Sequence, residues 1–359
     1  MVGSSQPLLR SRTSRMSTPV PSVLPGSAAP PPVVLPIPSE RVLTEGEIVI
    51  RNDLFTMLDG FAHDVGPRGH TAVARDVLHA LGGFRSRIGE EAWLASGVPL
   101  AREHAIFGIL QEDPITSHSF TRPRGYPGDA GLLDLMYGHE AVSARVASAS
   151  EIGRAINAYT VNADMCESVR LRRGILAGAI DDAAARRPGA SVLVVACGHL
   201  REAEVSVALR EGRIGRLLAT DQDENSLAVV AGYAKTISPA VEPMKLSVRD
   251  FISGKRALGT FDLVYAAGLY DYLDDRISAR LTRKLFALLN PGGRAIVANF
   301  LGGRVETAYM EAYMNWSLIY RTREQIEGFA AEISEVDVAS RRYFEDAVSC
   351  VGYLELERA

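Results

Sequence analysis

A glycine-containing turn and a carboxylate, each placed after a short apolar segment, are the residues of this chain best suited to bind a nucleoside. The first segment runs into Ala196-Cys197-Gly198-His199, and the second ends at Asp221-Gln222. A loop that binds the pyrophosphate of a dinucleotide carries further glycines, which let its backbone approach the phosphates. Leu200 and Arg201 occupy that region here, which disfavours NAD and FAD. A nucleoside without phosphates, such as S-adenosylmethionine, needs one close approach, and Gly198 can provide it.

Further residues would complete such a nucleoside site. Asp221 can accept hydrogen bonds from both ribose hydroxyls, whereas Asp223 is also placed to cap the helix that follows. Asp250 can accept from an adenine amino group while Phe251 packs on the ring, although a solvated turn Asp beside a core Phe is the alternative. Ala267-Gly268 follow a buried apolar segment. Because open parallel sheets bind ligands at the carboxyl ends of their strands, this pair should face the reactive end of the nucleoside.

The elements that must position these residues begin near residue 188. From there to residue 359, short apolar runs alternate with helical stretches, a pattern typical of βαβ units and a parallel sheet. We expect strands at 192–197, 217–220, 245–248, 261–266 and 293–300, and helices at 202–210, from 225 onward and at 276–289. Residues 336–341 and 348–356 are expected to pair as antiparallel strands at one edge. Seven strands in this order predict an α/β, Rossmann-like fold with the seven-stranded sheet of class I methyltransferases.

Residues 40–187 precede this sheet and have helical periodicity, so we expect a helical cap that shapes the substrate site. Helices are predicted at 43–61, from 72 to a break at Gly82-Gly83, at 100–110 with a stop at Pro114, at 132–137 and at 151–180. Residues 1–39 are rich in Ser, Pro, Ala and Arg, which predicts a disordered leader. A transit peptide, or a true start at Met16, are the other interpretations of this leader.

Composition limits the class of function. The 359 residues are 47% hydrophobic and 23% charged, with a net charge of -4, so no basic excess indicates nucleic acid as a partner. No apolar run reaches the roughly 18 residues of a membrane span. Cys166, Cys197 and Cys350 are widely separated, which fits neither a disulfide framework nor a zinc site and favours the cytoplasm. The histidines show no metal spacing, so we expect no metal; the sequence does not indicate an oligomeric state.

Four stretches carry a resemblance to a known bacterial family. They are Arg122–Asp129 with the sequence RPRGYPGD, Ala267–Leu273, Ala298–Phe300, and Trp316–Arg321 with the sequence WSLIYR. Residues 189–300 resemble a class I S-adenosylmethionine-dependent methyltransferase, and the four stretches resemble the family of 3-hydroxypalmitic acid methyl ester biosynthesis, over about residues 100–357. That family is also similar to enzymes that cyclise S-adenosylmethionine to azetidine-2-carboxylate. The resemblance implies S-adenosylmethionine as cofactor and a small-molecule acceptor such as a 3-hydroxy fatty acid.

The chain departs from the general class I pattern where the methionyl end of the cofactor binds. Those enzymes carry an acidic residue in the first strand that holds the ammonium, and the matching position here is Val194. We therefore expect other residues to bind this end, with the loop 124–129, Tyr159 and Asn162 as candidates. An ammonium without a nearby carboxylate has a lowered pKa. A free amine is what cyclisation needs.

Residues of the cap and of later loops are candidates for the reaction. A sulfonium is an activated electrophile, so the protein mainly has to align it with the acceptor, and an ionised carboxylate acceptor needs no general base. Tyr126, Tyr159 or Tyr270 could stabilise the sulfonium by cation–π contact. Arg321 or Arg124 could orient a carboxylate by bidentate hydrogen bonds. The other substrate-side candidates are Asp129, Asn162, Asn299, Trp316 and Tyr320.

Several of these candidates have a purely structural alternative. Arg124 with Asp129 could be an ion pair that orders the loop, and Trp316 with Tyr320 could be part of a core stripe on a helix. Three functions stay open at this point. They are methyl transfer to a small molecule, cyclisation of S-adenosylmethionine, and binding of this cofactor without catalysis.

Overall fold

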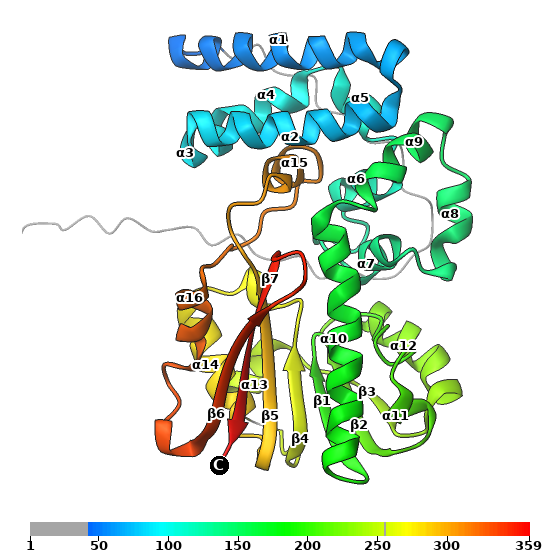
Figure 1. Ribbon diagram of the computed structural model, residues 1–359, viewed down its shortest axis with the longest axis vertical. Helices are drawn as coiled ribbons and strands as arrows, with labels where there is room; N and C mark the ends of the chain where they lie inside the picture. The colour runs from blue at the N-terminus through cyan, green and yellow to red at the C-terminus, as the bar shows by residue number, and fades with distance from the viewer. Residues whose placement is uncertain (1–41, 255) are drawn as a thin grey trace, which may run out of the picture. The chain divides into compact units, whose positions relative to one another are not determined.

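A seven-stranded sheet with the order β3-β2-β1-β4-β5-β7-β6 organises the second half of the chain (Figure 1). The computed structural model describes residues 42–254 and 256–359, so the predicted leader lies outside the described residues. The strands are β1 (Ala190–Val195), β2 (Ile214–Asp221), β3 (Val241–Lys245), β4 (Phe261–Ala266), β5 (Leu289–Phe300), β6 (Val338–Glu345) and β7 (Val351–Arg358). Strands β1 to β5 pair in parallel, and β7 pairs antiparallel with both β5 and β6. The predicted α/β fold is confirmed, including the antiparallel pair at one edge.

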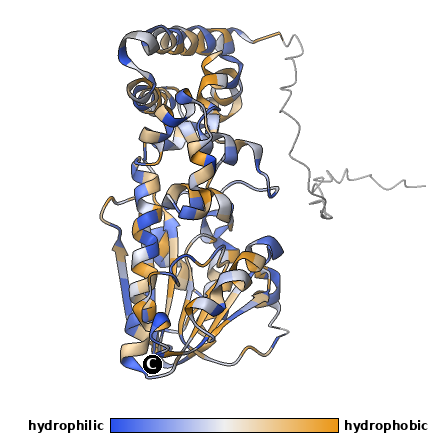
Figure 2. Ribbon diagram, turned by 90° about the vertical axis from the view of Figure 1, so that its right-hand side faces the viewer, coloured by the Kyte–Doolittle hydropathy of each residue, from blue (hydrophilic) through white to orange (hydrophobic). Residues whose placement is uncertain are grey.

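The central strands are apolar on both faces because helices cover both sides of the sheet. Val192 and Val194 of β1 pack in the cluster that includes Leu176 of helix α10 (Asp164–Arg186). Leu193 and Val195 point to the other face, toward the cluster of helix α14 (Asp275–Phe286). In Figure 2, orange segments mark the hydrophobic residues of the sheet, and orange and blue alternate along the helices. The sequence pattern of continuous apolar runs therefore reflects burial from two sides.

The parallel register brings the ends of three strands to one edge. Val195 of β1 pairs with Thr220 of β2, and Val194 pairs with Tyr265 of β4. The turn after β1, the end of β2 and the loop after β4 therefore lie side by side. Helices α12 (Glu224–Ile237) and α13 (Val248–Ser253) follow β2 and β3 at the same edge, and α11 (Val207–Arg210) precedes β2.

Helices of the first half stand above this edge of the sheet, and α10 continues from them along the sheet face (Figure 1). They are α1 (Glu45–Arg68), α2 (His70–Ile88), α3 (Glu90–Ala92), α4 (Val98–Glu103), α5 (Ile106–Leu110), α6 (Pro114–Thr121), α7 (Ala130–Tyr137), α8 (Ser143–Ala147) and α9 (Glu151–Thr160). Helix α15 (Glu306–Tyr313) follows β5 and packs against α2 and α4, and the short α16 (Arg323–Glu327) packs against β7. The described residues from 42 onward cluster as one compact unit, and the proposed boundary near residue 187 stays a prediction.

Several predicted helix limits were wrong. Helix α2 continues through Gly82, where a Cβ atom would lie 2.8 Å from the carbonyl oxygen of Val305, so the glycine permits close packing rather than ending the helix. Pro114 begins α6 instead of stopping a helix, because Asp113 caps the backbone N–H groups of Ile115 and Thr116. The predicted helix 100–110 is divided into α4 and α5, and the predicted helix 151–180 into α9 and α10.

The third strand was also misplaced. The strand predicted at 245–248 ends at Lys245, and Val248 already begins α13. Ser247 caps this helix in a capping box with Asp250, which is the local signal that ends the extended segment. The predicted helix 202–210 is helical only from Val207. Among the described residues, no helix combines the length and the apolar character needed to cross a bilayer.

Candidate ligand-binding site

A cavity of about 590 Å³ opens at the carboxyl ends of β1, β2 and β4. The turn after β1, the end of β2 and the loop after β4 form its floor. Helices α7 and α10 and the segment between α6 and α7 form its roof. Of the predicted site residues, those that line it are Tyr126, Ala196, Cys197, Gly198, Asp221, Gln222, Ala267 and Gly268. A cavity of this size and mixed polarity is typical of a site for a small organic ligand.

The turn after β1 lies close to the roof because its backbone is left-handed at alternate residues. Ala196, Gly198 and Leu200 have φ angles of 54°, 53° and 51°. A Cβ atom on Gly198 would lie 3.2 Å from the Cβ of Ala130 on α7, so the glycine permits a close approach of the two elements. Left-handed Ala and Leu are strained conformations that the surrounding structure has to hold.

Asp221 is held at the end of β2 by two backbone hydrogen bonds. Its Oδ2 accepts from Gly198 N at 2.9 Å, and its Oδ1 accepts from Asp223 N at 2.8 Å. Burial raises the pKa of Asp221, although these hydrogen bonds oppose the effect. Each carboxylate oxygen can accept a further hydrogen bond. The side chain therefore faces the cavity in a fixed orientation with free acceptor capacity, while Asp223 caps α12 as expected.

The predicted adenine contacts do not reach the cavity. The Asp250 side chain is exposed and accepts from the Ser247 backbone at 2.8 Å, and Phe251 is buried in the core on the α14 side of the sheet. Leu246, Ser247 and Val248 line the cavity instead. The prediction was displaced by a few residues because the strand ends before residue 246.

Two buried charged side chains line the cavity and were missed. Arg172, on α10, is 5% exposed, and its Nη1 donates to the carbonyl oxygen of Ala267 at 2.6 Å. Glu202 is 6% exposed, and its Oε1 accepts from the hydroxyl of Tyr265 on β4 at 2.7 Å. Burial raises the pKa of Glu202, against the opposing effects of Tyr265 and Arg172. Arg172 lies in the stretch Arg170-Leu171-Arg172-Arg173, so no local signal in the sequence distinguished it from its arginine neighbours.

The roof segment is tied to the sheet by Arg124. Its Nη1 donates to Asp223 Oδ2 at 2.8 Å, and its Nη2 lies 2.9 Å from His199 Nε2. Asp129 instead caps α7, with its Oδ1 2.8 Å from His118 Nε2, so the alternative of an Arg124–Asp129 ion pair is not what the structure shows. Arg124, Asp129 and His199 therefore position the roof and do not line the cavity.

His199 is anchored away from the cavity by a buried carboxylate. Its Nδ1 lies 2.8 Å from Asp134 Oδ2, and the guanidinium of Arg201 bonds both oxygens of Asp134 at 2.8 Å. Burial would raise the pKa of Asp134, but these hydrogen bonds outweigh it and lower the pKa to about 2. The network fixes the first residues after the Gly198 turn.

Arg321, Asn299 and Tyr270 do not contact the cavity. Arg321 is 2% exposed, and its Nη1 donates to Asn299 Oδ1 at 2.7 Å and to the Tyr270 carbonyl at 2.9 Å. Its Nε donates to Asp275 and its Nη2 to the Leu273 carbonyl. The Tyr270 ring packs on Phe329 on the opposite face of the sheet. These residues hold the loop after β4 and do not line the cavity, so the structure gives no support to their predicted roles at the sulfonium or the acceptor.

Three other substrate-side candidates also lie apart. The Tyr159 hydroxyl lies 3.3 Å from His79 Nε2, and Asn162 donates to the Ala158 carbonyl at 2.9 Å. Neither they nor Tyr320 line the cavity. Trp316 takes an intermediate position, because its Nε1 donates to the hydroxyl of Tyr272, a cavity residue, at 2.8 Å.

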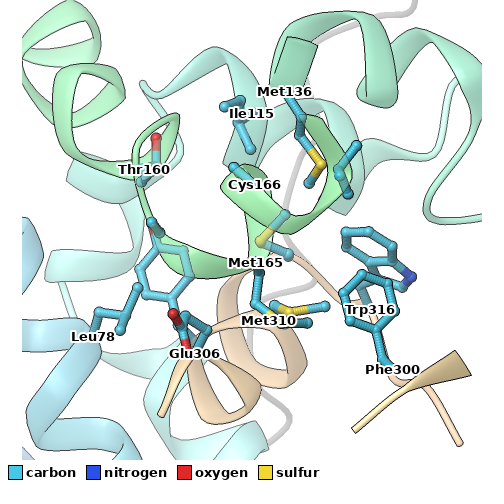
Figure 3. A pocket seen from close by; sticks show the side chains of 14 residues that line it. Leu78, Ile115, Met136, Thr160, Met165, Cys166, Phe300, Glu306, Met310 and Trp316 are labelled. Carbon is cyan, nitrogen blue, oxygen red and sulfur yellow. The ribbon is translucent and has the colours of Figure 1, made fainter. Parts of the chain in front are cut away.

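A second, apolar cavity of about 30 Å³ lies beyond Trp316. Figure 3 shows Trp316 and Phe300 on one side of it and Glu306 on the opposite side. Successive turns of α10 line the two cavities, with Val169 facing the second and Arg172 the first. The second lining also contains the flexible side chains of Met136, Met165, Met310 and Met314. Trp316 therefore separates a mixed-polarity cavity from an adaptable apolar one.

Comparisons with known proteins concern the fold. No protein-family model and no curated protein sequence matches this chain. A solved structure of a possible exported protein from Bordetella parapertussis is 18% identical with a TM-score of 0.55, and the match covers 76% of this chain and 97% of that one. At this identity the likeness establishes a shared fold.

Two methyltransferase structures also match over part of the chain. The N-methyltransferase NodS from Bradyrhizobium japonicum WM9, in complex with S-adenosyl-l-homocysteine, is 14% identical with a TM-score of 0.40, over 63% of this chain and 99% of that one. Magnesium protoporphyrin IX methyltransferase ChlM from Synechocystis PCC 6803, with bound S-adenosylhomocysteine, is 11% identical with a TM-score of 0.42, over 64% and 100%.

Proposed function

We propose that this protein is an S-adenosylmethionine-dependent methyltransferase that acts on a small molecule. The observation that carries the proposal is the junction of Gly198 and Asp221 on the cavity floor, where a carboxylate with free acceptor capacity sits beside a single close-approach glycine. This arrangement suits a ribose and leaves no glycine-rich nest for a pyrophosphate. The cofactor is therefore an adenosyl compound without phosphates.

The lining residues suggest how the cofactor lies in the cavity. Its adenine packs against Leu246 and Val248, with Ser247 beside it, and its ribose hydroxyls bond Asp221 with Gln222 nearby. The sulfonium then lies over the loop Ala267-Gly268. Tyr126, which lines the roof, takes the cation–π role in place of Tyr159 and Tyr270. Alignment of the methyl group with the acceptor supplies most of the catalysis, because the sulfonium is already activated.

The acceptor side favours a molecule with a carboxylate and an apolar part. Arg122 lines the cavity, and its buried Nε has no hydrogen-bond partner among the described residues, so it is better placed than Arg321 or Arg124 to orient a carboxylate. The apolar cavity beyond Trp316 holds only about 30 Å³, so a hydrocarbon portion enters it only when the flexible methionine side chains of its lining move apart. Together with the resemblance of the RPRGYPGD and WSLIYR stretches, this supports an acceptor such as a 3-hydroxy fatty acid.

The test is to incubate the purified protein with S-adenosylmethionine, with and without 3-hydroxy fatty acids of different lengths, and to identify products by mass spectrometry. S-adenosylhomocysteine and a methyl ester, formed only when both substrates are present, are the expected products. Methylthioadenosine with azetidine-2-carboxylate in the absence of an acceptor would identify a cyclase instead. Tight binding without turnover over a broad panel of acids, amines and alcohols would contradict the enzymatic proposal.

A further inference from the structure

We infer that Glu202 and Arg172 bind the two charged groups of the cofactor's amino-acid end, with Glu202 accepting from the ammonium and Arg172 donating to the carboxylate. This inference rests on the proposed function. It assigns a subsite to residues that lie far apart in the sequence and carry no motif.

Strand β1 lacks an acidic residue at the cavity, so another side chain has to bind the ammonium. Val194 is 1% exposed and lines the cavity, so this strand offers no carboxylate to an ammonium. Among the described residues that line the cavity, the acids are Asp221 and Glu202 and the bases are Arg122 and Arg172. Asp221 is engaged on the ribose side, which leaves Glu202 as the acid for the other end of the ligand.

The strand order places Asp221 near the ribose of the proposed cofactor and Glu202 near its amino-acid end. Asp221 ends β2, and Glu202 is bonded to Tyr265 of β4, on the other side of β1. Because neighbouring strands lie about 4.8 Å apart, β2 and β4 are separated by roughly 10 Å. A nucleoside whose ribose bonds Asp221 and whose chain crosses β1 therefore brings its amino-acid end to β4. Arg172 is bonded to Ala267, directly after β4, and so reaches the same region.

The absence of a salt-bridge partner for Glu202 and for Arg172 supports a role of both side chains in ligand binding. Neither Glu202 nor Arg172 forms a salt bridge within the described part of the chain, although both are more than nine-tenths buried. A buried charge normally has a charged partner, because desolvation is costly. A zwitterion between them would provide one partner for each side chain. Tyr265 on one side and the Ala267 carbonyl on the other hold the two groups in place before the ligand arrives.

The subsite has a chemical consequence for the reaction. An ammonium that faces an ionised Glu202 is stabilised in its protonated form. A protonated nitrogen has no lone pair with which to attack the γ-carbon of its own chain. The subsite therefore favours methyl transfer to an external acceptor over cyclisation, and it replaces the expectation that the ammonium has no carboxylate beside it.

The experiment uses three adenosyl ligands that carry different charged groups at this end. Each variant is compared with the wild type on the same ligand, because decarboxylated S-adenosylmethionine also carries the sulfonium charge that the other two lack. S-adenosylhomocysteine has both charged groups, decarboxylated S-adenosylmethionine has the ammonium alone, and methylthioadenosine has neither. Calorimetry on the full chain would measure their affinities for the wild type, Glu202→Gln and Arg172→Gln. Glu204→Gln is the matched control, because its carboxylate bonds Arg201 and His139 rather than lining the cavity.

We expect Glu202→Gln to weaken both ammonium-bearing ligands by roughly 10- to 100-fold, the range for a hydrogen bond to a charged group. Arg172→Gln should weaken S-adenosylhomocysteine to a similar extent but leave decarboxylated S-adenosylmethionine nearly unchanged, and Arg172→Lys should restore part of the loss. Methylthioadenosine should bind all variants and the control as it binds the wild type, which also shows that each is folded.

Two results would overturn different claims. Wild-type affinity of Glu202→Gln or Arg172→Gln for S-adenosylhomocysteine, with methylthioadenosine binding intact, would overturn the subsite and leave the proposed function standing. Failure of the wild type to bind any of the three ligands would overturn the proposed function itself. If the Glu202 variant does not fold, Tyr265→Phe tests the same point, because loss of the phenol that orients Glu202 should weaken the two ammonium-bearing ligands selectively.

Discussion

Two clusters of buried polar groups lie at the carboxyl edge of the sheet, one beside β5 and one between β1 and β4. In the β5 cluster, Arg321 donates to Asn299, to Asp275 and to two backbone carbonyls, and Asp271 accepts from the Phe300 N–H at 2.7 Å. In the cavity cluster, Arg172 donates to the Ala267 carbonyl and interacts with the Tyr137 hydroxyl, and Glu202 accepts from one phenol. The two arginines are similarly buried, at 2% and 5% exposure, so burial alone does not distinguish them.

The difference between the clusters lies in their remaining hydrogen-bonding capacity. A buried group whose partners are all supplied by the chain stabilises the fold and has nothing left for a ligand. A buried group with free capacity on a cavity wall is incomplete until a ligand arrives. The β5 cluster therefore positions the loop after β4, and Arg172 of the cavity cluster donates to a carbonyl of that loop. This distinction explains why Arg321, prominent in the sequence, is structural, while Glu202 and Arg172, which belong to no motif, face the cavity.

The largest expected effect is on the stability contributed by the β5 cluster. Arg321→Met leaves three acceptors of this buried cluster, the Asn299 Oδ1 and two backbone carbonyls, without their donor, which should lower the free energy of unfolding by about 3–5 kcal/mol. Urea unfolding followed by circular dichroism measures the loss. A loss of under about 1 kcal/mol, together with lost cofactor binding, would place Arg321 with the cavity cluster and remove the distinction.

The next effect is the pH dependence of the same cluster. Burial raises the pKa of Asp271 to about 6. The unfolded chain releases this proton near pH 4 and the folded chain holds it to about pH 6, so the unfolding free energy should fall as pH rises through this interval, by up to about 3 kcal/mol. Asp271→Asn cannot titrate and should lack this part of the decline. The measurement is the unfolding free energy of both proteins at several points between pH 4 and 7. If it changes equally with pH in the wild type and in Asp271→Asn, Asp271 does not cause the decline.

A smaller effect is expected in the cavity, and it concerns binding rather than stability. Asp221→Ala removes the acceptor for the ribose hydroxyls, so S-adenosylhomocysteine and methylthioadenosine should both bind roughly 100-fold more weakly. This equal loss differs from the selective loss expected for Glu202→Gln. Calorimetry with the two ligands gives the ratio, and a loss confined to S-adenosylhomocysteine would mean that Asp221 contacts the amino-acid end instead.

The smallest effect is expected for a substitution of Asp250, which lies outside both clusters. Asp250 is exposed and engaged in the capping box of α13. Asp250→Ala should change cofactor affinity by no more than about twofold, as for a surface substitution away from a site, with a slight loss of stability from the missing cap. A tenfold loss in affinity, measured by the same calorimetry, would restore the adenine contact that the sequence suggests.

Local pattern was sufficient to predict the sheet and part of the cavity lining. Continuous apolar runs identify β1, β2, β4 and β5 because strands covered on both faces exclude polar residues. Gly198 and Asp221 could be predicted because their position relative to the ends of two strands is itself a local property. Limits such as the end of β3 were missed because a capping box competes with strand propensity within a few residues.

The partners of the buried charges could not be read from the chain, because hydrogen bonds between distant segments decide them. Arg172 bonds a carbonyl 95 residues away, and Glu202 bonds a phenol 63 residues away. Folding determines which polar side chains find all their partners inside the protein and which retain unused donors or acceptors at a cavity. The amino-acid sequence thus specified the sheet and the edge at which the cavity opens, whereas long-range packing separated the residues that support the loop from those that face the cavity.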